Sequence, residues 1–137
     1  RAFHKIMPGI ALQGVPGVAS IYGAQFADEG FTLKHSEEGI LSQFNLGKPN
    51  TQIAQFFICL APCPHFDGKY AAFGKVIEGM EIVRKAGEWG SASGQPSKSV
   101  EIADCGECEG SIAAAHAQQA TASAAAPCSE RARSPCT

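Results

Sequence analysis

Two apolar runs separated by a turn-rich loop, all within residues 51–76, constrain the fold more than any other part of this 137-residue chain. Residues 55–60 and 70–77 are rich in aromatic, β-branched and small apolar side chains. The loop between them holds two prolines and an Asp67-Gly68 turn signal. This pattern predicts two β-strands joined by a loop.

The first of these runs carries an unusual pair of side chains. Because side chains alternate across a strand, Gln55 and Phe57 share one face, whereas Phe56 and Ile58 share the other. A glutamine is rarely kept in a plain apolar core. Gln55 beside Phe57 therefore indicates a groove that holds an apolar group and hydrogen-bonds a peptide backbone.

The rest of the chain predicts further strands, one helix and a tail. Strand-like runs occupy 3–6, 10–13, 40–44 and 100–105. In residues 79–89 the apolar side chains recur at steps of three and four, which predicts a helix. We therefore expect a mainly β domain over residues 1–107. Residues 108–137 are dominated by alanine, serine, glutamine and proline, and we expect them to be disordered because they have too little apolar surface to offset the entropy of ordering.

Charge and cysteine content argue against several classes of function. Eleven basic and thirteen acidic residues leave a formal charge of −2, which attracts neither nucleic acid nor an anionic membrane. No apolar run approaches the roughly 20 residues of a membrane helix. The six cysteines include a single C-x-x-C, at Cys105 and Cys108, whereas a zinc site requires four ligands. We expect reduced cysteines in a cytoplasmic protein, with no metal or cofactor; metal binding is the alternative.

Several short motifs, in the same order along the chain, are similar to those of cytosolic cyclophilins, which are peptidyl-prolyl cis-trans isomerases. They comprise Phe3-His4-Lys5-Ile6-Met7-Pro8-Gly9, Gln13-Gly14, Leu33-Lys34-His35, Gly39-Ile40-Leu41-Ser42, Gln55-Phe56-Phe57-Ile58, Phe73-Gly74-Lys75-Val76 and Ile102-Ala103-Asp104-Cys105-Gly106. The resemblance covers residues 1–107. It implies an antiparallel β-barrel of eight strands capped by helices, with a substrate groove on its outer face. The family places two strands and a helix before the segment that matches Phe3-His4, so the resemblance implies an incomplete barrel here.

The resemblance also implies which side chains form the groove. The expected catalytic residues are His4, Lys5, Gln55 and Phe57. The expected substrate-binding residues are Ile10, Ala11, Gln13, Phe44, Asn45, Leu46, His65, Phe66, Tyr70 and Phe73.

Several of these positions depart from the family pattern. Lys5 stands where the family has a catalytic arginine, and lysine lacks the planar fork of donors. Ile10 and Ala11 replace an aromatic and a larger apolar residue. Phe44 and Leu46 replace two alanines and are expected to narrow the groove. His65 replaces a tryptophan and Phe66 a leucine.

Three functions are consistent with these observations. The first is a cyclophilin-type isomerase that assists protein folding, with weak activity. The second is a module that binds proline-containing peptides without catalysis, and the third is an inactive fragment derived from a cyclophilin. The implied partners are proline-containing peptides and, with weakened affinity, the cyclic peptide cyclosporin.

Overall fold

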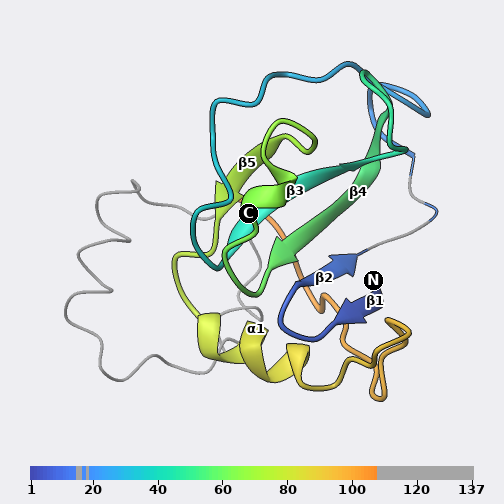
Figure 1. The fold of residues 1–137 in the computed structure, drawn as a ribbon. Coiled ribbons are helices and arrows are strands. Elements are labelled where there is room, and N and C mark those ends of the chain that lie inside the picture. The colour runs from blue at the N-terminus through green and yellow to red at the C-terminus, as the bar shows by residue number, and fades with distance from the viewer. Residues whose placement is uncertain (15–16, 18, 108–137) are drawn as a thin grey trace.

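The computed structural model describes residues 1–14, 17 and 19–107, and its main feature is one antiparallel sheet (Figure 1). The five strands of the described residues are β1 (Phe3–Met7), β2 (Ala11–Gly14), β3 (Ile40–Asn45), β4 (Gln52–Cys59) and β5 (Ala72–Lys75). Their order across the sheet is β1-β2-β4-β3-β5. A short 3₁₀ helix, η1 (Pro64–Phe66), lies in the loop after β4, and α1 (Met80–Gly87) follows β5.

The predicted mainly β class is confirmed, and so are the helix and five of the six predicted strands. The sixth, over 100–105, is wrong as a strand. It makes one isolated bridge, Glu101 with Ala2, flanked by the bonds Phe3 N–H to Val100 O and Ile102 N–H to Arg1 O. Among the described residues these contacts with Arg1 to Phe3 form a single bridge and no ladder. The tail expected to be disordered lies outside the described residues.

The two faces of the sheet contribute to two separate apolar clusters. Phe57 and Cys59 of β4 belong to one cluster, together with Ala11, Ile40 and Cys63. The partly buried Phe56 and Ile58 pack against the other, as the alternation of side chains requires. The second cluster consists of Phe3, Ile6, Leu12 and Ala86. Through Ala86, α1 covers this second face, as its position below β1 and β2 in Figure 1 shows.

A β-bulge in β1 decides which face receives its side chains. Phe3 pairs with Gly14, but Lys5 pairs with Gln13, so two residues of β1 advance against one of β2. In a regular strand Phe3 and Lys5 would share a face. Because of the extra residue, Phe3 packs in the second cluster, which α1 covers, whereas Lys5 lies on the opposite face of the sheet.

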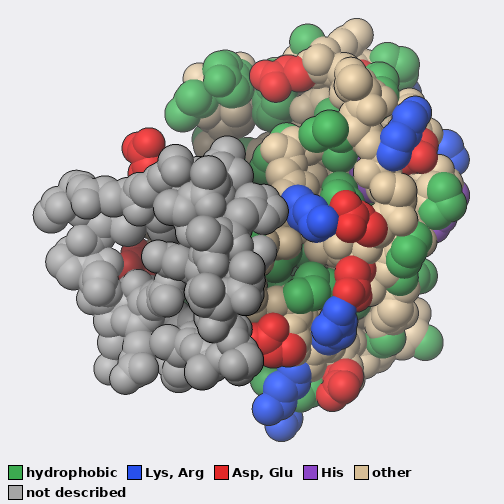
Figure 2. Space-filling model, turned by 90° about the vertical axis from the view of Figure 1, so that its left-hand side faces the viewer, with side chains coloured by type: hydrophobic (Ala, Val, Ile, Leu, Met, Phe, Trp, Pro, Cys, Tyr) green, Lys and Arg blue, Asp and Glu red, His purple; other side chains and the backbone are tan. Residues whose placement is uncertain are grey.

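Charged side chains of both signs lie side by side on the surface (Figure 2). Among the described residues, Lys75 pairs with Glu37 at 2.8 Å, and Arg84 pairs with Glu38. Such pairs, all exposed, contribute little to stability. None of the described helices is long and apolar enough to cross a membrane.

Candidate functional site

A cavity of about 340 Å³ opens on the face of the sheet away from α1. Its lining residues are Lys5, Met7, Ile10, Ala11, Gln13, Phe44, Phe57, His65, Phe66 and Tyr70. We call it the Lys5–Phe57 cavity. The structure thus brings together nine of the fourteen site residues expected from the sequence, and it adds Met7, which sequence reasoning missed.

Strand register places the central residues of this cavity in one row. Lys5 of β1 pairs with Gln13 of β2, and Gln13 pairs with Phe57 of β4. Directly paired residues of neighbouring strands point to the same face. A cation, an amide and an aromatic ring therefore stand side by side across three strands.

Gln55, expected in the site, is joined to this row by a hydrogen bond. The Gln13 Nε2–H donates to Gln55 Oε1 at 3.0 Å. With its carbonyl oxygen engaged, the Gln55 side chain keeps its two amide N–H donors for another group. Gln43 of β3 steadies the same stretch of β4, because its Nε2 donates to the backbone oxygens of Ile53 and, at 2.8 Å, of Gln55.

Four aromatic rings form the apolar wall of the cavity. Phe57 is 4% exposed, and its ring meets Phe66 and Tyr70 edge-on, with centroids 5.3 and 5.2 Å apart. Phe44 stacks on Tyr70 at 6.0 Å. The bulk of Phe44 is therefore part of the wall, and the cavity stays open beside it.

Four expected site residues lie elsewhere. His4 is exposed at the bulge and does not line the cavity. Partial burial of the otherwise exposed ring, and then the charge of Lys5, lower the pKa of His4. Leu46 is 53% exposed and also lies outside the lining. Phe73 belongs to a separate cavity of about 490 Å³ next to Tyr22 and Leu33.

Asn45 is the fourth of these residues, and its side chain is occupied within the protein. Its Nδ2–H donates to the Lys69 backbone oxygen at 2.6 Å, while its Oδ1 accepts from the Gly47 N–H at 2.9 Å. The side chain thus ties the end of β3 to the turn before Tyr70. These two bonds engage one N–H donor and the oxygen of the Asn45 amide in holding the fold, and its second N–H donor remains.

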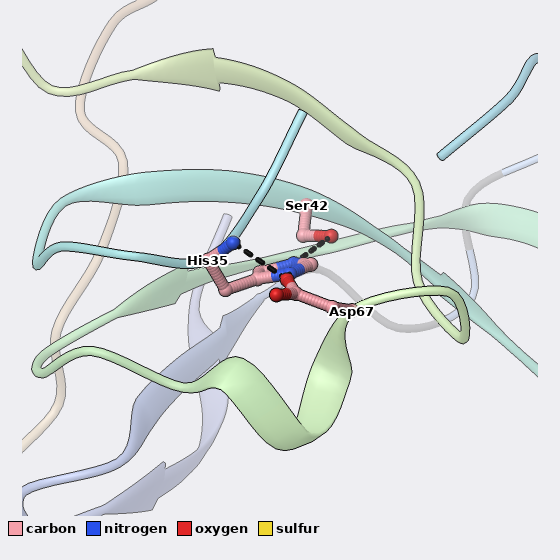
Figure 3. Close-up of polar contacts among 3 residues, drawn as sticks. All are labelled: His35, Ser42 and Asp67. Carbon is pink, nitrogen blue, oxygen red and sulfur yellow. Dashed lines mark hydrogen bonds and ion pairs between the residues drawn. The ribbon is translucent and has the colours of Figure 1, made fainter. Parts of the chain in front are cut away.

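Behind Phe57 lies a polar network of His35, Ser42 and Asp67, which Figure 3 shows. His35 Nδ1 lies 2.8 Å from Asp67 Oδ1, and its Nε2 lies 2.9 Å from Ser42 Oγ. The His35 backbone N–H also donates to Asp67 Oδ1, at 2.7 Å. Since a carboxylate only accepts, Nδ1 carries a proton, and the serine hydroxyl satisfies Nε2.

This network supports the cavity and is closed to substrate. His35 and Ser42 are both 0% exposed, so the serine hydroxyl cannot act as a nucleophile on an outside molecule. The His35 ring stacks on Phe57 at 6.3 Å, and Asp67 anchors the loop that carries Phe66 and Tyr70. These hydrogen bonds from His35 lower the pKa of Asp67. Sequence reasoning used Asp67 as a turn residue and missed the network, because its partners lie far apart along the chain.

Two cysteines lie beneath the cavity in reduced form. Cys59 and Cys63 are free thiols buried in the same cluster as Phe57. Burial, followed by the neighbouring Cys63, raises the pKa of Cys59 to about 12, and burial raises the pKa of Cys63. Within the described part of the chain no three His, Cys, Asp or Glu side chains are grouped to hold a metal ion. Cys108 of the C-x-x-C lies outside that part.

Comparison with known proteins gives one consistent result. The family described as cyclophilin type peptidyl-prolyl cis-trans isomerase/CLD matches residues 1–107. A cyclophilin-type peptidyl-prolyl cis-trans isomerase of Cryptosporidium parvum is similar in structure, with 37% identity and a TM-score of 0.67 over 72% of this chain and 67% of that one. The same parasite protein solved in the presence of the dipeptide Ala-Pro gives 36% identity and a TM-score of 0.66, over 72% and 68% of the two chains.

Proposed function

This chain belongs to the cyclophilin-type peptidyl-prolyl cis-trans isomerase family, and we propose that it binds proline-containing segments in the Lys5–Phe57 cavity and isomerises them slowly. The observation that carries the proposal is the row of Lys5, Gln13 and Phe57 across three paired strands. It puts a cation and an amide beside an apolar wall. The similar parasite protein was solved in the presence of Ala-Pro, a dipeptide of the kind that the cavity is proposed to take.

The wall suits the proline ring. Four aromatic side chains surround a space of about 340 Å³, near the lower end of the sizes typical of ligand pockets. A proline ring is rigid and apolar, so its burial against Phe57 releases water without a large loss of side-chain entropy. The backbone carbonyl next to the proline would then accept a hydrogen bond from the amide of Gln55, whose own carbonyl is held by Gln13.

The chemistry asked of this site is electrostatic. Rotation about a peptide bond has a barrier of about 18–20 kcal/mol, because resonance makes the C–N bond partly double. As the bond twists, the prolyl nitrogen regains its lone pair and becomes a hydrogen-bond acceptor. A cation near that nitrogen stabilises the twisted state more than either planar state, which lowers the barrier.

Lys5 supplies this cation, and its geometry is why slow catalysis is proposed. An ammonium is a point charge on a flexible stem, whereas a guanidinium presents a planar fork of donors. Lysine therefore retains the charge but orients it less strictly. Isomerisation of X-Pro bonds limits the folding of many chains, and assistance in that step is the cellular role that we propose.

A protease-coupled assay with a chromogenic Ala-Pro peptide tests the proposal. Lys5→Ala should lower kcat/KM by about tenfold to a hundredfold, the range for a lost charged hydrogen bond, and Lys5→Arg should raise it above the starting protein. Lys85→Ala is the matched control, because Lys85 lies exposed on α1. Equal rates for Lys5→Ala, Lys5→Arg and the unchanged chain would remove Lys5 from the mechanism.

The lysine at position 5, where the family pattern has an arginine, favours a second function, that of a binding module without catalysis. A binding module predicts that Ala-Pro peptides bind, which NMR shifts of Phe57 and Tyr70 would follow. The rate of isomerisation should nevertheless equal the rate without protein, even for Lys5→Arg. Cyclosporin provides a further ligand for the same titration. We propose that it binds weakly here because His65 replaces the tryptophan of the family pattern at the cavity rim, so His65→Trp should tighten it.

A further inference from the structure

The loop after α1 lies against the outer edge of β1, on the side that does not pair with β2. The Ile6 N–H donates to Gly94 O at 2.8 Å. A Cβ added at Gly90 would come within 2.5 Å of Ile6 O. The backbone of this loop therefore touches the strand that carries Lys5.

Gly94 meets the side chain of Lys5 directly. A Cβ at Gly94 would lie 2.8 Å from Lys5 Cγ and 2.9 Å from Lys5 Cε, closer than real Cβ contacts allow. The methylene stem of Lys5 thus rests on the bare α-carbon of Gly94. The loop itself is well tied, because the Gly94 N–H donates to Ser91 O and Ser91 Oγ donates to Gln95 O, both at 2.8 Å.

We propose that Gly94 is the positioning residue for Lys5: its bare α-carbon supports the lysine stem and so directs the ammonium toward the Lys5–Phe57 cavity. The stem of lysine is flexible, and a charge acts on a reacting bond only when it is held in place. This inference rests on the proposed function for its effect on catalysis. Its structural part concerns the placement of Lys5 alone.

Substitution of Gly94 by alanine tests the idea, and the chain offers a matched control. Gly94 has φ of +83° and Gly47 has φ of +81°, so alanine meets the same backbone strain at both. A Cβ at Gly47 would have no neighbour within 4 Å. Gly94→Ala should therefore lower kcat by about 5-fold to 100-fold with little change in KM, while Gly47→Ala should leave both unchanged. Equal activity of the two variants would overturn the proposal.

A double-mutant cycle separates positioning from general damage. In a Lys5→Ala background the stem is gone, so Gly94→Ala should cause no further loss of kcat. A further loss of the same size would overturn the proposal. If Gly94→Ala alone does not fold, the double variant still tests the contact between Gly94 and Lys5, because removal of the lysine stem should restore folding. A double variant that also fails to fold would count against that contact.

A second measurement keeps this inference distinct from the proposed function. Acetic anhydride labels exposed lysines, and peptide mass mapping gives the rate at Lys5 in each variant. We expect Gly94→Ala to change the labelling rate of Lys5 by more than about twofold relative to Gly47→Ala, because the displaced ammonium has new surroundings. If the unchanged chain has no isomerase activity, the proposed function fails and the activity tests no longer apply. The labelling rate then decides the positioning role by itself, and an unchanged rate at Lys5 overturns it.

Discussion

Replacement of Ser42 by alanine is the sharpest test of how this fold supports its cavity. The change removes one oxygen and leaves the shape of the β3 side chain almost unaltered. That oxygen lies 2.9 Å from His35 Nε2, and both residues are 0% exposed. Since water cannot reach the freed nitrogen without a rearrangement, His35 would lose its partner at Nε2.

The magnitude follows from this unpaired nitrogen. A buried polar group left without its partner costs about 1–3 kcal/mol. For a domain of this size each kcal/mol lowers Tm by about 4–8 °C, so Ser42→Ala should lower Tm by about 4–24 °C. A cost of this size is large against the roughly 5–15 kcal/mol that stabilises a typical domain.

Urea unfolding followed by circular dichroism measures this loss of stability. Ser99→Ala is the control, because the Ser99 hydroxyl is exposed and its one hydrogen bond among the described residues goes to Glu101 Oε1. The free energy of unfolding of this variant should change by less than about 0.5 kcal/mol. The slope of the unfolding curve should stay the same in both variants. A loss for Ser42→Ala no larger than for Ser99→Ala would show that His35 does not depend on this serine.

Three further predictions follow from the same structure. The hydrogen bonds from His35 keep the pKa of Asp67 below its usual 3.8, so their contribution to stability is present above pH 3.8 and is lost as pH falls through the lowered pKa. In a plot of the urea midpoint against pH, Asp67→Asn should therefore flatten the decline at acid pH. An unchanged decline would contradict this. Iodoacetamide should modify the exposed Cys105 in the folded protein but spare Cys59, whose pKa is raised to about 12, and mass mapping that finds Cys59 modified first would refute the burial argument. Because the charge of Lys5 contributes to the lowered pKa of His4, Lys5→Ala should raise that pKa in an NMR titration, whereas Lys5→Arg should leave it low.

Much of the sheet could be predicted because strands have a local pattern. The alternation in β4 separates Phe57 from Phe56, and the structure places the two rings on opposite faces of the sheet. The helical spacing after residue 79 likewise predicts α1. The predicted strand over 100–105 failed because a strand also needs a partner, which its own residues do not reveal.

The candidate site was predicted less evenly, for a physical reason. The resemblance supplied Lys5 and Gln13 as site residues, and strand register brings them together. It also supplied Asn45 and Phe73, whose side chains turn to other contacts. A motif identifies a position in the chain, but the hydrogen bonds of its neighbours decide where its side chain goes.

The amino-acid sequence alone determined the mainly β class, the family and the placement of Gln55 and Phe57 on the same face of one strand, because each depends on neighbours along the chain. Only the tertiary structure decided that Lys5 faces the cavity. A regular β1 would put Lys5 on the same face as Phe3, and the bulge against β2 separates them. The bulge arises from pairing between strands, so no property of β1 alone could have predicted it.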